Sequence, residues 1–96
     1  MWRLGRRFPF RDAPNTMSIV CCHVLDGAPV LRVTHDAEEG MWQFLCGNEH
    51  DANEARVIAL EEAYALDASI GKLAGMPCGY IAVRENLKAK WQIIQV

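Results

Sequence analysis

One strand-like segment near the middle of the chain constrains the fold more than any other feature. Residues 41–46 read Met-Trp-Gln-Phe-Leu-Cys and are followed by Gly47, so a bulky apolar or thiol side chain occurs at every second position. In a β-strand, alternate side chains lie on the same face, so Trp42, Phe44 and Cys46 share one face. Burying a tryptophan and a phenylalanine stabilises a domain by several kcal/mol, and we therefore expect this face to lie in the core.

Two earlier segments are predicted to form an antiparallel meander with this strand. Residues 18–25 and 30–35 are rich in β-branched and apolar side chains. The turn between them contains Gly27 and Pro29, two residue types that favour chain reversal. We expect these two strands to pair with each other as a hairpin.

The next turn decides which face Trp42 occupies. A plain five-residue loop over residues 36–40 would place Trp42 and Phe44 on the same face as the polar Arg32. A β-bulge at Gly40 shifts the register by one residue and moves both aromatic side chains to the core face. We predict this bulge; a helix covering the other face of the sheet is the alternative.

Short helices and a terminal pair of strands are predicted for the second half of the chain. Residues 54–66 have helical spacing, although residues 56–60 could also pair as a strand. Asp67 has the side chain of a helix cap. The predicted elements are helices at 61–66 and 68–73 and strands at 80–84 and 91–96. The fold class is therefore α+β, an antiparallel β-meander with one or two short helices and a C-terminal strand pair.

Length and composition limit the chain to one domain of an ordinary globular kind. A second core in 96 residues would have too little apolar surface to offset chain entropy. The chain is 51% hydrophobic and 23% charged, and no apolar run approaches the roughly 18 residues that a membrane span needs. Four cysteines without an export signal indicate a reducing, cytoplasmic compartment in which the cysteines remain thiols.

The first 16 residues differ in charge from the rest of the chain. They hold four arginines and one aspartate in a loop-like composition without a clear period. We predict that residues 1–16 are a poorly ordered basic appendage and that residues 17–96 are the domain; a functional basic arm is the alternative. Without the appendage the net charge changes from −2 to −5, and an acidic body argues against nucleic acid as a partner.

Acidic side chains dominate the middle of the sequence. From Asp36 to Glu62 there are eight acids, with Arg56 as the single base. Such a surface could steer association with a basic partner protein, or could act only in keeping the protein soluble. The predicted binding residues are Asp36, Glu38, Glu39, Glu49, Asp51 and Glu54.

Cysteine and histidine side chains offer an alternative function. Structural zinc sites usually show paired ligands such as C-x2-C, whereas the adjacent Cys21 and Cys22 would point to opposite faces of a strand. Cys46 and His50 are the candidate pair, as metal ligands or as a thiol nucleophile with its base. Otherwise Cys46 is a small buried apolar residue, the usual role of a free cysteine.

The other histidines and the last cysteine are not expected to form a functional site. His23 and His35 are expected on the strand surface, and Cys78 stands alone in the sequence. The glycines match neither a dinucleotide-binding nor a phosphate-binding loop, so no cofactor is expected.

Several short motifs together resemble a known family. They are Cys22-His23-Val24, Pro29-Val30-Leu31, Trp42 to Gly47, Leu66-Asp67-Ala68-Ser69 and Arg84-Glu85. Across residues 19–91 the chain resembles the bacterial domain-of-unknown-function family 2185, which is related to the immunity-protein-like domains of polymorphic toxin systems. The resemblance implies an α+β fold and binding of a toxin-like partner, and it supplies no catalytic residues.

The leading prediction is therefore a non-enzymatic, immunity-like protein-binding domain with an acidic surface. The alternative is a small metal-binding or thiol-dependent enzyme that uses Cys46 and His50.

Overall fold

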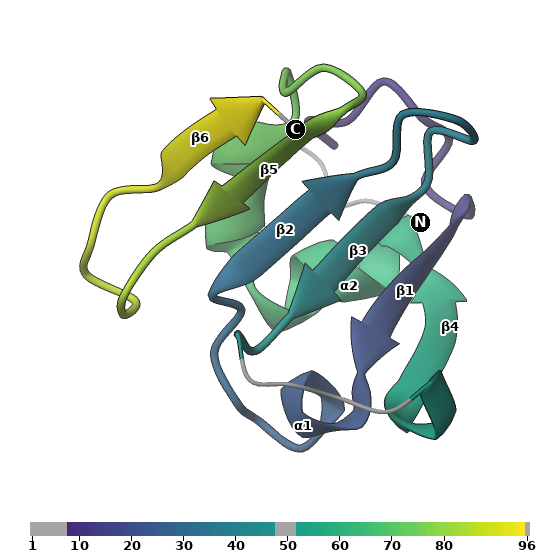
Figure 1. Ribbon diagram of the computed structural model, residues 1–96. Coiled ribbons are helices and arrows are strands. Elements are labelled where there is room, and N and C mark those ends of the chain that lie inside the picture. The colour runs from purple at the N-terminus through teal and green to yellow at the C-terminus, as the bar shows by residue number, and fades with distance from the viewer. Residues whose placement is uncertain (1–7, 48–51, 96) are drawn as a thin grey trace.

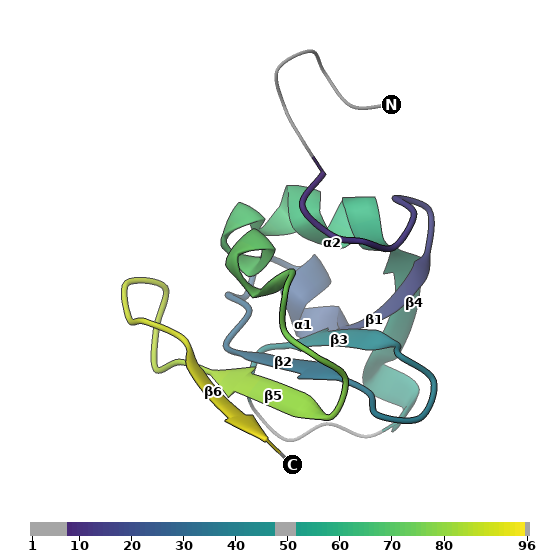
Figure 2. The same ribbon diagram turned by 90° about the horizontal axis from the view of Figure 1, so that it is seen from above.

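A six-stranded mixed sheet forms the framework of the α+β fold in the computed structural model, which describes residues 8–47 and 52–95 (Figure 1). The elements in chain order are β1 (Met17–Cys21), α1 (Cys22–Leu25), β2 (Arg32–His35), β3 (Trp42–Leu45), the 3-10 helix η1 (Ala52–Glu54), β4 (Ala55–Ala59), α2 (Leu60–Leu66), the 3-10 helix η2 (Ala68–Leu73), β5 (Tyr80–Val83) and β6 (Gln92–Gln95). The strand order is β4-β1-β3-β2-β5-β6, and Figure 2 shows α1 and α2 on one face of the sheet. The predicted α+β class is confirmed.

The first strand does not pair with the second. β1 ends at Cys21, and the next four residues form the single helical turn α1. β1 instead lies parallel to β3, with Ile19 opposite Gln43, and antiparallel to β4. The predicted hairpin between residues 18–25 and 30–35 is therefore wrong. A turn of helix satisfies its backbone groups locally and still buries Val24 in the core, so residues 22–25 need no strand partner.

The turn between β2 and β3 produces the predicted register. His35 lies opposite Trp42 and Val33 lies opposite Phe44 in this antiparallel pair. Trp42 is 2% exposed and Phe44 is fully buried, so both rings belong to the core. Gly40 has a φ of 72°, a conformation that favours glycine, and it lies where the chain reverses. The predicted shift of one residue at this turn is confirmed.

Residues 54–66 are predicted as either a helix or a strand followed by a helix, and the structure contains a strand that is followed directly by a helix. β4 pairs with β1 as far as Ala59, and α2 then begins at Leu60. The backbone N–H of Ala59 donates to a carboxylate oxygen of Glu62 at 2.9 Å, which stabilises the start of α2. Asp67 accepts a hydrogen bond from the backbone N–H of Ser69 at 3.0 Å, as expected of a cap for η2.

The C-terminal strand pair is also confirmed, since β5 pairs antiparallel with β6.

None of the helices formed by residues 8–47 and 52–95 is both long enough and apolar enough to cross a membrane.

The segment before β1 is part of the core. Phe10 is 6% exposed, and its ring meets that of Trp42 edge to face with centroids 5.1 Å apart. It also meets the ring of Tyr64 in α2 edge to face, with centroids 6.5 Å apart, so it packs against both the sheet and the helix. The predicted boundary that leaves residues 8–16 outside the domain is therefore wrong. Residues 1–7 lie outside the described residues.

Candidate metal centre

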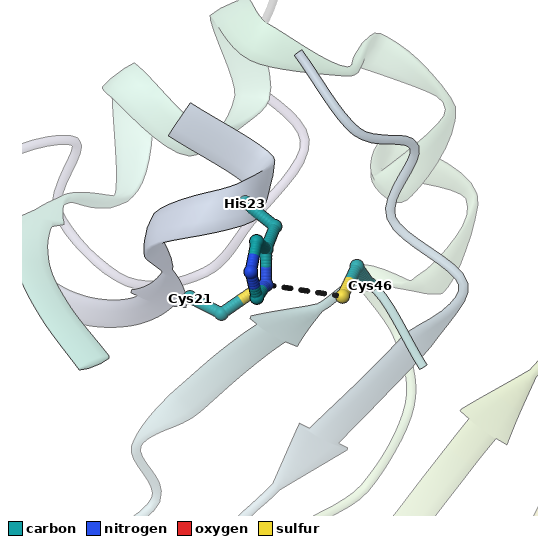
Figure 3. Close-up of side chains that lie close together, drawn as sticks. All are labelled: Cys21, His23 and Cys46. Atoms are coloured by element: carbon teal, nitrogen blue, oxygen red, sulfur yellow. Dashed lines mark hydrogen bonds between the residues drawn. The ribbon is translucent and has the colours of Figure 1, made fainter. Parts of the chain in front are cut away.

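Two neighbouring parallel strands bring cysteine and histidine side chains to one edge of the sheet. β1 ends at Cys21, and the chain continues directly into α1, which contains His23. β3 ends one residue before Cys46. Because β1 and β3 run in the same direction, their ends lie side by side. Figure 3 shows the three side chains gathered at this point.

The ligand atoms of the three residues are spaced as in a metal site. The sulfur atoms of Cys21 and Cys46 and a ring nitrogen of His23 all lie within 4.8 Å of one another. The Nδ1 atom of His23 is 3.8 Å from the Sγ atom of Cys46. Tetrahedral zinc, with Zn–S of about 2.3 Å and Zn–N of about 2.0–2.1 Å, separates its ligand atoms by about 3.5–3.8 Å. A small contraction of the cluster would therefore bring these three atoms to the spacing of ligands in tetrahedral zinc.

The two thiols and the imidazole differ in their exposure to solvent. Cys21 is 1% exposed and Cys46 is 6% exposed, so the sulfur ligands come from the interior. The side chain of His23 is 45% exposed. The site is therefore anchored in the core on one side and open to entry of an ion on the other.

A carboxylate supports the imidazole from the neighbouring strand. β4 pairs with β1 so that Ala55 lies opposite Cys21, and this pairing places Glu54 beside α1. The Oε2 atom of Glu54 is 3.5 Å from the Nε2 atom of His23. Metal-binding histidines usually donate their second ring N–H to a carboxylate, which fixes the tautomer and raises the basicity of the ligating nitrogen. Glu54 occupies the position of such a supporting group.

A second group of potential ligands shares the same imidazole. Cys22, His23 and Glu54 also lie within 4.8 Å of one another, and the Cys22 thiol is 4.0 Å from the Oε2 atom of Glu54. We favour the first group because it supplies two buried thiols and uses Nδ1, leaving Nε2 for the carboxylate. In that arrangement Cys22 and Glu54 lie beside His23 and do not themselves bind the metal.

One of the two predicted ligands lies in this site. Cys46 is present, but its described neighbour is His23, which was expected on the strand surface; His50 lies outside the described residues. Cys21 and Cys22 do not continue one strand, because the helical turn begins between them. The sequence feature that marks this site is a cysteine at the end of each of two strands. That feature predicts a shared site only when the two strands are known to be parallel neighbours.

The predicted acidic binding residues occupy two places. One group lies in the turn before β3, and the other lies just before β4, at the opposite end of the sheet. The first group is Asp36, Glu38 and Glu39, and the second is Glu54. Glu49 and Asp51 lie outside the described residues.

Comparisons with protein-family models, with curated proteins and with solved structures give no match to this chain. The resemblance to an immunity-protein-like family therefore stays a prediction.

Proposed function

We propose that this protein is a metal-binding domain that holds a Zn²⁺ ion through Cys21, His23 and Cys46. The observation that carries the proposal is the convergence of two thiols and one imidazole nitrogen within 4.8 Å, from segments far apart in the sequence. Thiolate and imidazole groups are the ligands that zinc prefers in proteins. Calcium and magnesium take oxygen ligands and do not suit this set.

The bound ion would cross-link two segments whose ends already lie side by side in the fold. It would tie the first turn of α1, through His23, to the end of β3, through Cys46. Metal binding of this kind adds its free energy to folding, because the unfolded chain has no preformed site. Three protein ligands also leave a fourth tetrahedral position, which zinc enzymes use to hold a water molecule. Thiol ligands must stay reduced, so the proposal suits a reducing compartment such as the cytoplasm.

Zinc titration with matched cysteine variants tests the proposal. We expect the purified protein, after treatment with a chelator, to bind one Zn²⁺ per chain in calorimetry. Cys46→Ser should remove this binding, whereas Cys78→Ser should retain it, because Cys78 is exposed and lies at the other end of the sheet. Circular dichroism spectra of both variants serve as the control that each of them is folded. Equal zinc binding by Cys46→Ser and the unchanged protein would overturn the proposal.

A second candidate function is the binding of a basic, toxin-like partner through the turn before β3. Glu38 and Glu39 are exposed there, and within the described part of the chain neither carboxylate forms an ion pair. Charged side chains in such a position speed association with an oppositely charged partner. A toxin gene beside the gene for this chain would supply the partner to test. Glu38→Lys combined with Glu39→Lys should then weaken the complex, and unchanged affinity would count against this surface.

A further inference from the structure

A second cysteine–histidine pair lies at the opposite end of the sheet from the candidate metal centre. Cys78 is exposed in the loop before β5, and its Sγ atom is 3.6 Å from the Nε2 atom of His35, the last residue of β2. β2 and β5 are paired, and the backbone N–H of Gly79 donates to the carbonyl oxygen of His35 at 2.7 Å. These backbone contacts fix the cysteine loop beside the histidine.

The surroundings of His35 define the role of each ring nitrogen. Its Nδ1 atom is 2.7 Å from the carbonyl oxygen of Met76, which can only accept a hydrogen bond, so Nδ1 carries a hydrogen. In the neutral ring, Nε2 then presents its lone pair to the thiol of Cys78. The imidazole also stacks on the ring of Trp42, with centroids 3.8 Å apart and planes inclined by 12°. The arrangement therefore contains a nucleophile, a base and groups that orient the base.

A pocket of about 550 Å³ opens beside this pair, a size typical of small-molecule sites. Its lining includes His35 and Cys78 together with three charged side chains: Arg11, Asp12 and Glu39. Among the described residues, none of these three side chains takes part in an ion pair. A cation and two carboxylates around one opening are complementary to a ligand that carries both carboxylate and ammonium groups.

We propose that Cys78 is a reactive thiol, activated by His35, and that its pocket binds small disulfides with amino-acid-like ends, of which glutathione disulfide is an example. The Nε2 atom of His35 accepts the thiol proton, and the sulfur of Cys78 attacks one sulfur of the disulfide. The disulfide bond of the ligand breaks, and its leaving thiolate takes the proton from the imidazolium. Cys78 is thereby oxidised to a mixed disulfide, and the other half of the ligand is reduced to a free thiol.

The mixed disulfide is the end product of this reaction in the described structure. Cys21, Cys22 and Cys46 lie at the other end of the sheet, so none of them is placed to resolve it. A second small thiol from solution would regenerate Cys78 by the reverse exchange. The site is therefore suited to reversible modification of Cys78, independently of metal binding.

The reactivity of Cys78 can be tested on the unchanged protein. Each cysteine is alkylated with iodoacetamide for increasing times, in the folded protein and in urea, and the peptides are quantified by mass spectrometry. We expect Cys78 to react about tenfold faster or more in the folded protein than in urea, since a positioned base typically accelerates proton transfer by ~10²–10⁴. Exposure alone can at most equal the unfolded rate. A folded rate no higher than the rate in urea would overturn the proposal.

Two substitutions at His35 test the base directly. His35→Phe keeps an aromatic ring against Trp42, and His35→Asn keeps a polar side chain, but neither can accept the proton. In either variant that retains its folded circular dichroism spectrum, the rate at Cys78 should fall about tenfold or more toward the rate in urea. An unchanged rate in a folded variant would show that His35 does not activate the thiol.

The choice of disulfide tests the pocket. Glutathione disulfide is compared with bis(2-hydroxyethyl) disulfide, which is uncharged, by following formation of the mixed disulfide on Cys78. Arg11→Gln should slow the reaction with glutathione disulfide several-fold and leave the uncharged disulfide unaffected. Lys72→Gln, an exposed cation outside the pocket lining, should change neither rate. Equal effects of Arg11→Gln on both disulfides, or none on either, would overturn the assignment of the ligand class.

Discussion

The Nδ1 atom of His23 lies 3.8 Å from the Sγ atom of Cys46, although 23 positions separate the two residues in the sequence. The contact exists because β1 and β3 are adjacent and parallel, so that the residues following each strand meet at one edge of the sheet. Cys21 completes the group from the end of β1. A sheet in which β1 and β2 formed the predicted hairpin would not produce this group.

The carboxylate of Glu54 is predicted to strengthen metal binding through His23. Glu54→Gln removes the charge 3.5 Å from the Nε2 atom but keeps the shape of the side chain. Loss of such a supporting group typically weakens metal affinity by ~10–100-fold, and we expect a decrease in zinc affinity of this size in competition titrations. Glu38→Gln is the matched control, since the same change there is exposed and distant from the site. Equal affinity of both variants would show that Glu54 does not support the histidine.

Removal of the metal is predicted to lower stability. A ligand that binds the folded state alone stabilises it by about 2.7 kcal/mol at a free concentration of ~100 times Kd. Zinc at this excess should therefore raise the melting temperature of the metal-free protein, and a chelator should reverse the change. Cys46→Ser, which lacks one ligand, should melt at the same temperature with and without zinc. A melting temperature of the unchanged protein that does not respond to zinc would contradict the prediction.

A buried ion pair is predicted to contribute strongly to stability away from the metal centre. The Arg84 side chain is 2% exposed; it donates to a carboxylate oxygen of Asp67 and to the carbonyl oxygen of Val30, both at 3.0 Å, and lies over the ring of Trp91. Arg84→Ala leaves the carboxylate of Asp67, which is 16% exposed, without its charged partner. We expect a loss of about 3–5 kcal/mol in the free energy of unfolding, measured with denaturant.

Lys88→Ala is the control for this measurement, because Lys88 is exposed on the neighbouring loop. A surface substitution of this kind usually changes stability by less than about 0.5 kcal/mol. A similar small effect of Arg84→Ala would show that the ion pair contributes little.

The segment before β1 is predicted to unfold cooperatively with the rest of the domain, because Phe10 packs in the core. Phe10→Ala removes a ring that packs between Trp42 and Tyr64, and truncating a buried phenylalanine typically costs about 3–5 kcal/mol. Arg11→Ala, at the next and exposed position, should change the free energy of unfolding by less than about 0.5 kcal/mol. If Phe10→Ala were as mild as Arg11→Ala, the segment would lie outside the cooperative unit.

Local patterns in the sequence predicted the parts of the fold that depend on neighbouring residues. The alternation of Trp42 and Phe44 gave the register of the β2–β3 hairpin, and Asp67 marked the start of η2. The pairing of β1 depended on contacts distant in sequence. Residues 22–25 are apolar enough for a strand, yet one helical turn buries Val24 equally well, and local propensity does not separate these outcomes.

The candidate site was only partly predictable for the same reason. Cys46 stood out because it ends a strand, but its partner was sought nearby at His50 rather than across the sheet at His23. Ligand spacing in the sequence identifies metal sites built on one hairpin or knuckle. A site assembled from the ends of two parallel strands has no fixed spacing, so the sheet topology has to be known first.

Cobalt substitution tests the central claim most directly, because Co²⁺ reports both thiolate ligation and coordination geometry by its absorption spectrum. The chelator-treated protein is titrated with Co²⁺, beside Cys21→Ala, Cys46→Ser and the control Cys78→Ser. We predict a thiolate-to-cobalt charge-transfer band and tetrahedral ligand-field bands that saturate at one Co²⁺ per chain. Cys78→Ser should retain the spectrum, and both other variants should lose intensity. A spectrum without thiolate bands, or one that Cys21→Ala and Cys46→Ser leave unchanged, would contradict a metal centre formed by Cys21, His23 and Cys46.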